Sequence, residues 1–153
     1  VGGAYVIGAF DIENNPLLAL FIPLIAAMGG NVGVQSSAIV VQGLAASNIS
    51  TKNIFEQLSK ELDVGLLNGI ICSTIIFLIT YLFGFGASLS ITVGISLLCV
   101  IVFAALFGTF IPLFLEKRNI DPAIATGPFI TTANDIIGLI IYFSISSLVS
   151  SYF

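Results

Sequence analysis

Charged residues are scarce in this sequence of 153 residues, at 8% of the chain, and histidine and tryptophan are absent. Without histidine, a Ser-His triad, most general-base schemes and the usual zinc site are excluded. The net charge of −4 is small and scattered, so we expect no nucleic-acid partner. Cys72 and Cys99 lie within apolar runs at a spacing that fits no zinc motif, which predicts buried thiols that act as small apolar residues.

Apolar residues are abundant instead, at 58% of the chain. Four apolar runs are each long enough to cross a bilayer of ~30 Å as a helix. They cover residues 16–46, 64–83, 89–115 and 123–150. A further run, Val1–Phe10, has about half the ~20 residues that a span needs, and we expect it to be the end of a truncated helix. The sequence therefore predicts an all-α membrane protein of about five transmembrane helices, with residues 1–153 as one domain surrounded by lipid.

The basic residues lie in only two of the connections between these runs. Residues 47–63 contain Lys52 and Lys60, and residues 116–122 contain Lys117 and Arg118. Cytosolic loops carry an excess of Lys and Arg, which predicts that both connections and the missing N-terminal part are cytosolic and that the C-terminus is outside. Within the first connection, apolar and charged residues alternate at helical spacing over 53–63, so we expect a short amphipathic helix on the inner membrane surface.

Asp135 is the one charged residue inside a spanning run, about midway along the last run. An Asp at the centre of a membrane helix costs about 2.5–3.5 kcal/mol on insertion scales, so we expect its side chain to face protein, water or an ion. Gly127, Thr131, Gly138 and Tyr142 share its face at helical spacing and form a stripe of small or polar groups. The alternative is an Asp that a hydrogen bond fixes to another helix.

A glycine-rich segment, residues 29–37, interrupts the first complete apolar run. Its three glycines within five residues predict a bend or a close contact between helices. Asn31, Gln35 and Gln42 recur at spacings of four and seven, so their amides can share one face and offer carbonyl oxygens to a polar interior. The alternative is that the small residues only allow packing and the amides only join helices.

Oxygen donors without thiolate or imidazole favour hard cations such as magnesium, calcium or sodium. One carboxylate in each chain makes a weak site. Two chains that meet at a symmetry axis could share one divalent ion between two Asp135 side chains. Because magnesium gives up its water reluctantly, such a pair would hold the waters bound to the ion rather than the metal itself.

Three stretches of the sequence resemble the transmembrane domain of the MgtE family of magnesium channels. They are Pro23–Gln42 (PLIAAMGGNVGVQSSAIVVQ), Val64–Gly69 (VGLLNG) and Asp121–Tyr142 (DPAIATGPFITTANDIIGLIIY). The resemblance implies a homodimer with five helices in each chain around a central pore. It places the ion-recognising aspartate of the family on Asp135, with the backbone carbonyl of Thr131 one turn earlier. The cytosolic N-terminal domain and the CBS regulatory domain of the family have no counterpart in this sequence.

From these residues and this resemblance we expect a magnesium-selective channel domain in a bacterial inner membrane, and no enzyme. Mg²⁺ is then the transported ion and not a catalytic cofactor. The residues expected to line or support the pore beside Asp135 and Thr131 are Asn31, Gln35, Gly127, Asn134 and Gly138. Two other functions stay open: a coupled divalent-cation carrier, and a membrane assembly subunit that transports nothing and in which Asp135 only joins helices.

Overall fold

The computed structural model describes residues 16–49, 53–125 and 127–152, which form four long α-helices and two 3-10 helices. In chain order these are η2 (Pro16–Phe21), α2 (Ile22–Ala45), α3 (Ile54–Leu82), α4 (Ala87–Lys117), η4 (Pro122–Ala125) and α5 (Pro128–Ser150). All four α-helices are long and apolar enough to cross a membrane. The four complete spanning helices predicted from the sequence are thus confirmed as helices, whereas the run Val1–Phe10 lies outside the described residues.

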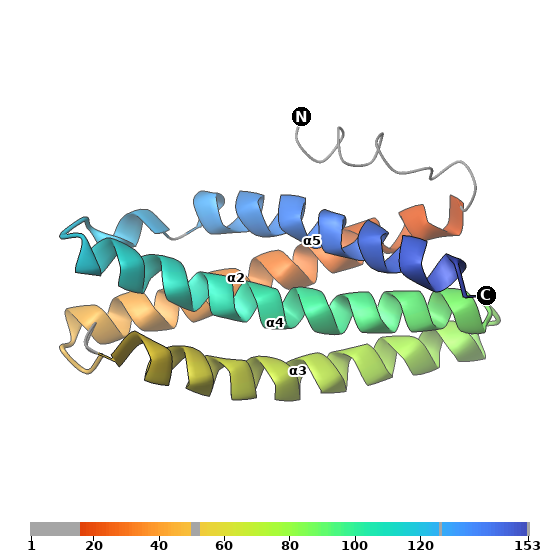
Figure 1. Ribbon diagram of the computed structural model, residues 1–153, viewed down its shortest axis with the longest axis horizontal. Coiled ribbons are helices and arrows are strands. Elements are labelled where there is room, and N and C mark those ends of the chain that lie inside the picture. Colours follow the sequence, from red (N-terminus) through yellow and green to blue (C-terminus); the bar gives the residue numbers. More distant parts are fainter. Residues whose placement is uncertain (1–15, 50–52, 126, 153) are drawn as a thin grey trace.

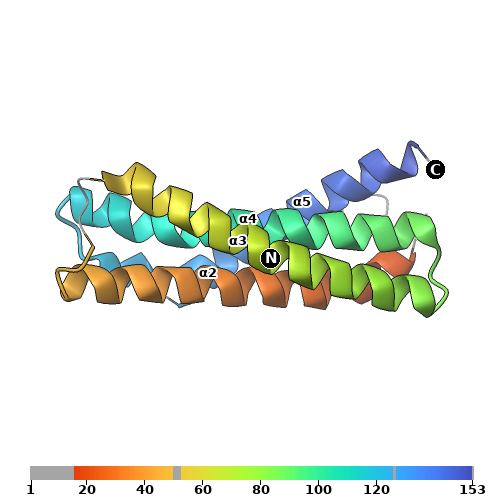
Figure 2. The same cartoon turned by 90° about the horizontal axis from the view of Figure 1, so that it is seen from below.

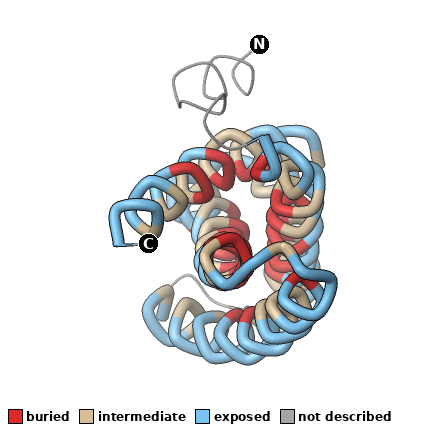
Figure 3. Tube along the Cα trace, turned by 90° about the vertical axis from the view of Figure 1, so that its right-hand side faces the viewer, coloured by how far each residue is buried: buried red, intermediate tan, exposed pale blue. Residues whose placement is uncertain are grey.

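Helix α4 lies at the centre of the bundle and packs against α2, α3 and α5 (Figure 1). α2 and α4 run in one direction and α3 and α5 in the other. α5 also packs along α2, whereas α3 crosses α4 obliquely on the other side (Figure 2). Seen along the bundle, buried residues lie where the helices face one another and exposed residues cover the outside (Figure 3). The α2–α5 pair therefore has the central helix behind it, and no described helix covers its outer face.

The difference between α4 and α3 follows from their contacts. α4 is apolar all round, as expected of a buried helix, and buries residues along its whole length, including Val93, Ile101 and Ala104. α3 buries only Gly65, Gly69 and Thr80. A Cβ added at Gly65 would lie 3.2 Å from Cβ of Ala105, so this glycine lets the two helices approach closely. From Val64 to Leu82, α3 presents mostly apolar side chains outward, as a lipid-facing helix does.

The two cysteines are not buried as predicted: Cys72 is half-buried and Cys99 is exposed. The prediction was wrong because both lie in apolar membrane runs, where an outward-facing position is as apolar as an inward-facing one. The Cys72 thiol donates a hydrogen bond of 3.6 Å to Oδ1 of Asn68, one turn earlier on α3. Both thiols are free.

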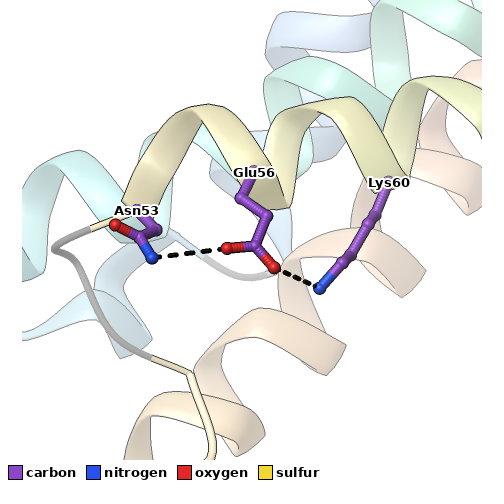
Figure 4. Close-up of polar contacts among 3 residues, drawn as sticks. All are labelled: Asn53, Glu56 and Lys60. Atoms are coloured by element: carbon purple, nitrogen blue, oxygen red, sulfur yellow. Dashed lines mark hydrogen bonds and ion pairs between the residues drawn. The ribbon is translucent and has the colours of Figure 1, made fainter.

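Residues 54–63 are helical, but they do not form the separate surface helix that the sequence predicted. They are the first turns of α3, because no Gly or Pro separates them from the apolar run that follows. Lys60 donates to Oε1 of Glu56 at 2.7 Å, and Asn53 donates to Oε2 of Glu56 at 3.3 Å (Figure 4). Ser36 on α2 donates a short hydrogen bond of 2.5 Å to Oε1 of Glu61, which ties this part of α3 to the bundle.

Both connections with basic residues lie at one end of the bundle, where α2 and α4 end and α3 and α5 begin (Figure 1). Lys117 ends α4 and Arg118 follows it, with its guanidinium 5.4 Å from the centre of the Phe114 ring. At the opposite end, Gly84 and Gly86 adopt positive φ of 81° and 85° and connect α3 to α4. The two basic connections are therefore on the same side, as predicted, and which side is cytosolic stays a prediction.

Candidate functional site

Asp135 lies in the third turn of α5, on the side that faces α2. The helix begins only at Pro128, so Asp135 is nearer its N-terminal end than the sequence suggested. Gly127 precedes the helix with φ 59° and ψ −124°, a conformation that a residue with a side chain rarely adopts, and Pro128 supplies no N–H to a preceding turn. The apolar run that starts at residue 123 is therefore split into η4 and α5.

The carboxylate of Asp135 is partly exposed, and no hydrogen bond or ion pair reaches it from the described residues. Facing it on α2 is Gly30: a Cβ added there would lie 3.6 Å from Oδ1 of Asp135 and 3.6 Å from Cγ2 of Thr131. An ionised carboxylate in a membrane helix needs a polar partner. None of the described residues supplies one, so water, a cation, a second molecule or a residue outside the described ranges is left to do so.

The Thr131 side chain forms hydrogen bonds at the start of its own helix. Its hydroxyl donates to the backbone carbonyls of Gly127 at 3.2 Å and of Pro128 at 3.1 Å, so it is not aimed at Asp135. The Thr131 carbonyl lies one turn before Asp135, and a carbonyl within a helix keeps a second lone pair beside its helical hydrogen bond. That this carbonyl meets an ion's hydration shell stays a prediction.

The stripe predicted along α5 does not face a single helix, and its two halves differ in burial. Thr131 and Asp135 lie against Gly30 of α2, whereas Gly138 lies against α4 and the Tyr142 hydroxyl reaches η2. Thr131 and Asp135 are partly exposed because Gly30 has no side chain to cover them. Gly138 is buried, and a Cβ there would lie 3.4 Å from Cγ1 of Val100. Tyr142 is fully buried, and its hydroxyl donates to the carbonyl of Leu18 at 3.0 Å. The open part of the stripe is therefore limited to the N-terminal turns of α5.

The amides predicted to support the site lie on the outer face of α2. Asn31, Gln35 and Gln42 are all exposed on the single chain, and no hydrogen bond joins them to Asp135 among the described residues. Amides exposed at this depth in a membrane would contact lipid unless water or another chain covers them. The α2–α5 pair therefore carries two exposed polar groups: the three amides on α2 and the carboxylate of Asp135 on α5.

Asn134, which is expected to line or support the pore, lies in a close contact between helices. It is 1% exposed and lies between helices rather than on the open face, and neither of its side-chain polar atoms has a hydrogen-bond partner among the described residues. An unpaired buried polar group costs about 1–3 kcal/mol. A Cβ added at Gly33 would overlap the amide nitrogen of Asn134, and a Cβ at Gly29 would lie 3.9 Å from its Cβ. The glycine-rich segment is therefore a close helix contact inside an unbroken α2.

Two buried hydrogen bonds connect η4 and the C-terminal half of α5 to the neighbouring elements. The hydroxyl of Ser37 on α2 donates to the carbonyl of Ala125 in η4 at 2.6 Å, and both residues are buried. The bond from Tyr142 to η2 fixes the C-terminal half of α5. Sequence reasoning missed the Ser37 contact, because a serine in an apolar helix gives no sign of which distant carbonyl it will meet.

Comparison with known proteins adds a family match. The model of the family described as "MgtE: Divalent cation transporter" matches residues 22–145. Curated proteins named "Magnesium transporter MgtE" are similar: that of Bacillus subtilis is 38% identical over 130 residues, and that of Enterococcus faecalis is 36% identical over 142 residues. That of Thermus thermophilus is 33% identical over 137 residues. These matches cover 85%, 93% and 90% of the chain but only 29%, 31% and 30% of the relatives.

Proposed function

Because the chain belongs to the MgtE family of divalent cation transporters, a family of transporters and not of enzymes, we propose that this multi-pass membrane protein conducts Mg²⁺ past Asp135. The observation that carries the proposal is the Asp135 carboxylate, which is partly exposed in a membrane helix and lacks a partner among the described residues. A passing cation would provide the missing partner. The relatives named as magnesium transporters support the choice of ion.

The ion at this position keeps its water. Mg²⁺ binds water in a rigid octahedron and loses it reluctantly, so the carboxylate accepts hydrogen bonds from the bound waters. The Thr131 carbonyl offers a second acceptor one turn away. Gly30 places no side chain against Asp135, so no side chain at this position of α2 covers the carboxylate.

A homodimer completes the site in this proposal. One carboxylate in each chain is a weak site for a divalent ion, whereas a two-fold axis along the open face of α2 and α5 brings two Asp135 side chains to one ion. The same contact covers the exposed amides of Asn31 and Gln35, which lie on α2. Gly127 and Gly138 support this pore through the backbone of α5, and Asn134 supports it from within the bundle.

The basic residues set the orientation. Lys60, Lys117 and Arg118 lie at one end of the bundle, and that end is cytosolic in the bacterial inner membrane by the positive-inside rule. The C-terminus of α5 is then outside.

Uptake of Mg²⁺ into liposomes that contain the protein tests the function. We expect rapid uptake down a Mg²⁺ gradient, with no dependence on an opposing proton or sodium gradient. Uptake that requires such a gradient would replace the channel with a coupled carrier. No uptake under either condition would favour an assembly subunit and contradict the proposal.

A further inference from the structure

The glycine face of α2 contacts two consecutive residues of α5. Gly33 lies against Asn134, and Gly30 lies against Asp135. Consecutive residues of an α-helix project about 100° apart, so their directions are fixed relative to each other. Whatever sets the direction of the Asn134 side chain therefore also sets the direction of the Asp135 carboxylate.

Within the described part of the chain, close packing fixes Asn134 and hydrogen bonds do not. Its amide nitrogen lies so close to Gly33 that a methyl group there would overlap it and would come within 2.9 Å of Cγ2 of Ile130. Both of its polar atoms are buried without a hydrogen-bond partner among the described residues. An amide that served to join helices would have a partner on α2 or α4. The tight fit of the Asn134 amide on Gly33 instead limits how α5 can rotate about its own axis.

The contact extends to the central helix. Gly108 of α4 lies against the backbone of Gly33, and a Cβ at Gly108 would lie 3.1 Å from Cα of Gly33. Gly108, Gly33 and Asn134 thus form one continuous contact through α4, α2 and α5. Gly108 and Gly33 meet through their backbones, so the Asn134 side chain is the one group of these three that can move when a helix shifts.

We propose that Asn134 is a positioning residue for ion recognition: seated on Gly33, it sets the rotation of α5 and so aims the Asp135 carboxylate. This inference rests on the proposed function and deepens it. The aim of the carboxylate matters because Mg²⁺ holds its bound waters in a near-ideal octahedron, so their hydrogen-bond acceptors have to lie at fixed positions, whereas the coordination shell of Ca²⁺ is flexible. A misdirected carboxylate therefore reduces the preference for Mg²⁺ over Ca²⁺.

The test compares Mg²⁺ and Ca²⁺ uptake into liposomes by the parent and by Asn134→Ala. We expect the ratio of Mg²⁺ to Ca²⁺ uptake to fall about tenfold, the size of effect that residues behind metal ligands have. The unfolding temperature in detergent should change little, because the packing lost with the buried amide is offset by the removal of two buried polar atoms that have no hydrogen-bond partner among the described residues. Asn68→Ala, which shortens an exposed Asn on α3, is the matched control and should leave the ratio unchanged.

A double-mutant cycle that combines Asn134→Ala with Gly33→Ala gives a second test, which does not depend on Asn134→Ala alone. The added methyl group displaces the amide of Asn134, so Gly33→Ala alone should also lower the ratio. In the double variant the overlap with the amide is gone and only the smaller one with Cγ2 of Ile130 remains, so the ratio should lie closer to that of Asn134→Ala than to the product of both effects. Asn134→Ser provides a further variant if Asn134→Ala does not fold.

The outcomes separate this inference from the proposed function. An unchanged ratio in Asn134→Ala and Asn134→Ser would overturn the positioning role, as would a lower unfolding temperature with an unchanged ratio. Asp135→Asn, measured beside them, tests the function itself. If it abolishes Mg²⁺ uptake while the Asn134 variants keep the ratio of the parent, only the positioning role fails.

Discussion

Asp135→Asn should lower the rate of Mg²⁺ uptake into liposomes at least about tenfold. The substitution keeps the size of the side chain and removes the charge that accepts hydrogen bonds from the waters of the ion. A hydrogen bond to a charged group contributes about 1.5–3 kcal/mol, and about 1.4 kcal/mol corresponds to a factor of ten. The fold should persist, because no described residue hydrogen-bonds to Asp135 and a neutral side chain is easier to insert into a membrane.

Asp63→Asn is the matched control for this measurement. It makes the same chemical change at an exposed position on α3, a helix that packs on α4 and not on α5. Its uptake should equal that of the parent. Equal uptake by Asp135→Asn and Asp63→Asn would show that the carboxylate in α5 is not on the ion pathway.

Gly108→Ala should destabilise the bundle by about 1–3 kcal/mol, the usual effect of overpacking a buried contact, and should also reduce uptake. Its methyl group would overlap the carbonyl oxygen of Gly33, and a backbone atom cannot move aside as a flexible side chain can. α2 must then separate from α4, which disturbs the surface on which Asn134 and Asp135 are seated. The free energy of unfolding in detergent and the uptake rate measure the two effects.

Gly94→Ala serves as control for Gly108→Ala, because it adds the same methyl group to the same helix. At Gly94 the new Cβ would lie 3.4 Å from the carbonyl oxygen of Ser73 and 3.5 Å from Cβ of Phe77, which are ordinary contacts. Stability and uptake should both stay close to those of the parent. Equal stability of the two variants would contradict the close α2–α4 contact.

Much of the fold could be predicted because membrane helices are long apolar runs. The four complete spans and the shared side of the two basic connections follow from hydropathy and from the positions of lysine and arginine. The start of α3 could not be found in this way, because its first turns are polar and contain no residue that breaks a helix. Burial could not be predicted either: Cys99 lies in an apolar run and is nevertheless exposed.

The candidate site was only partly predictable. Asp135 stands out because a charge in a spanning helix is rare. It lies on the side of α5 that faces α2, and it has no hydrogen-bond partner among the described residues. The environment of Asn134 could not be predicted, since it depends on which glycines of two other helices lie against it. The sequence shows glycines that permit a close contact but does not show which residue fills it.

Mg²⁺ protection of a cysteine at position 131 tests the central claim, that Mg²⁺ binds beside Asp135, most directly. In a protein with Cys72 and Cys99 replaced by Ala, Thr131→Cys places a thiol one turn from the carboxylate. The account predicts that Mg²⁺ slows the reaction of this thiol with a water-soluble thiol reagent, and that adding Asp135→Asn removes the protection. Identical reaction rates with and without Mg²⁺ in the protein that retains Asp135 would contradict it.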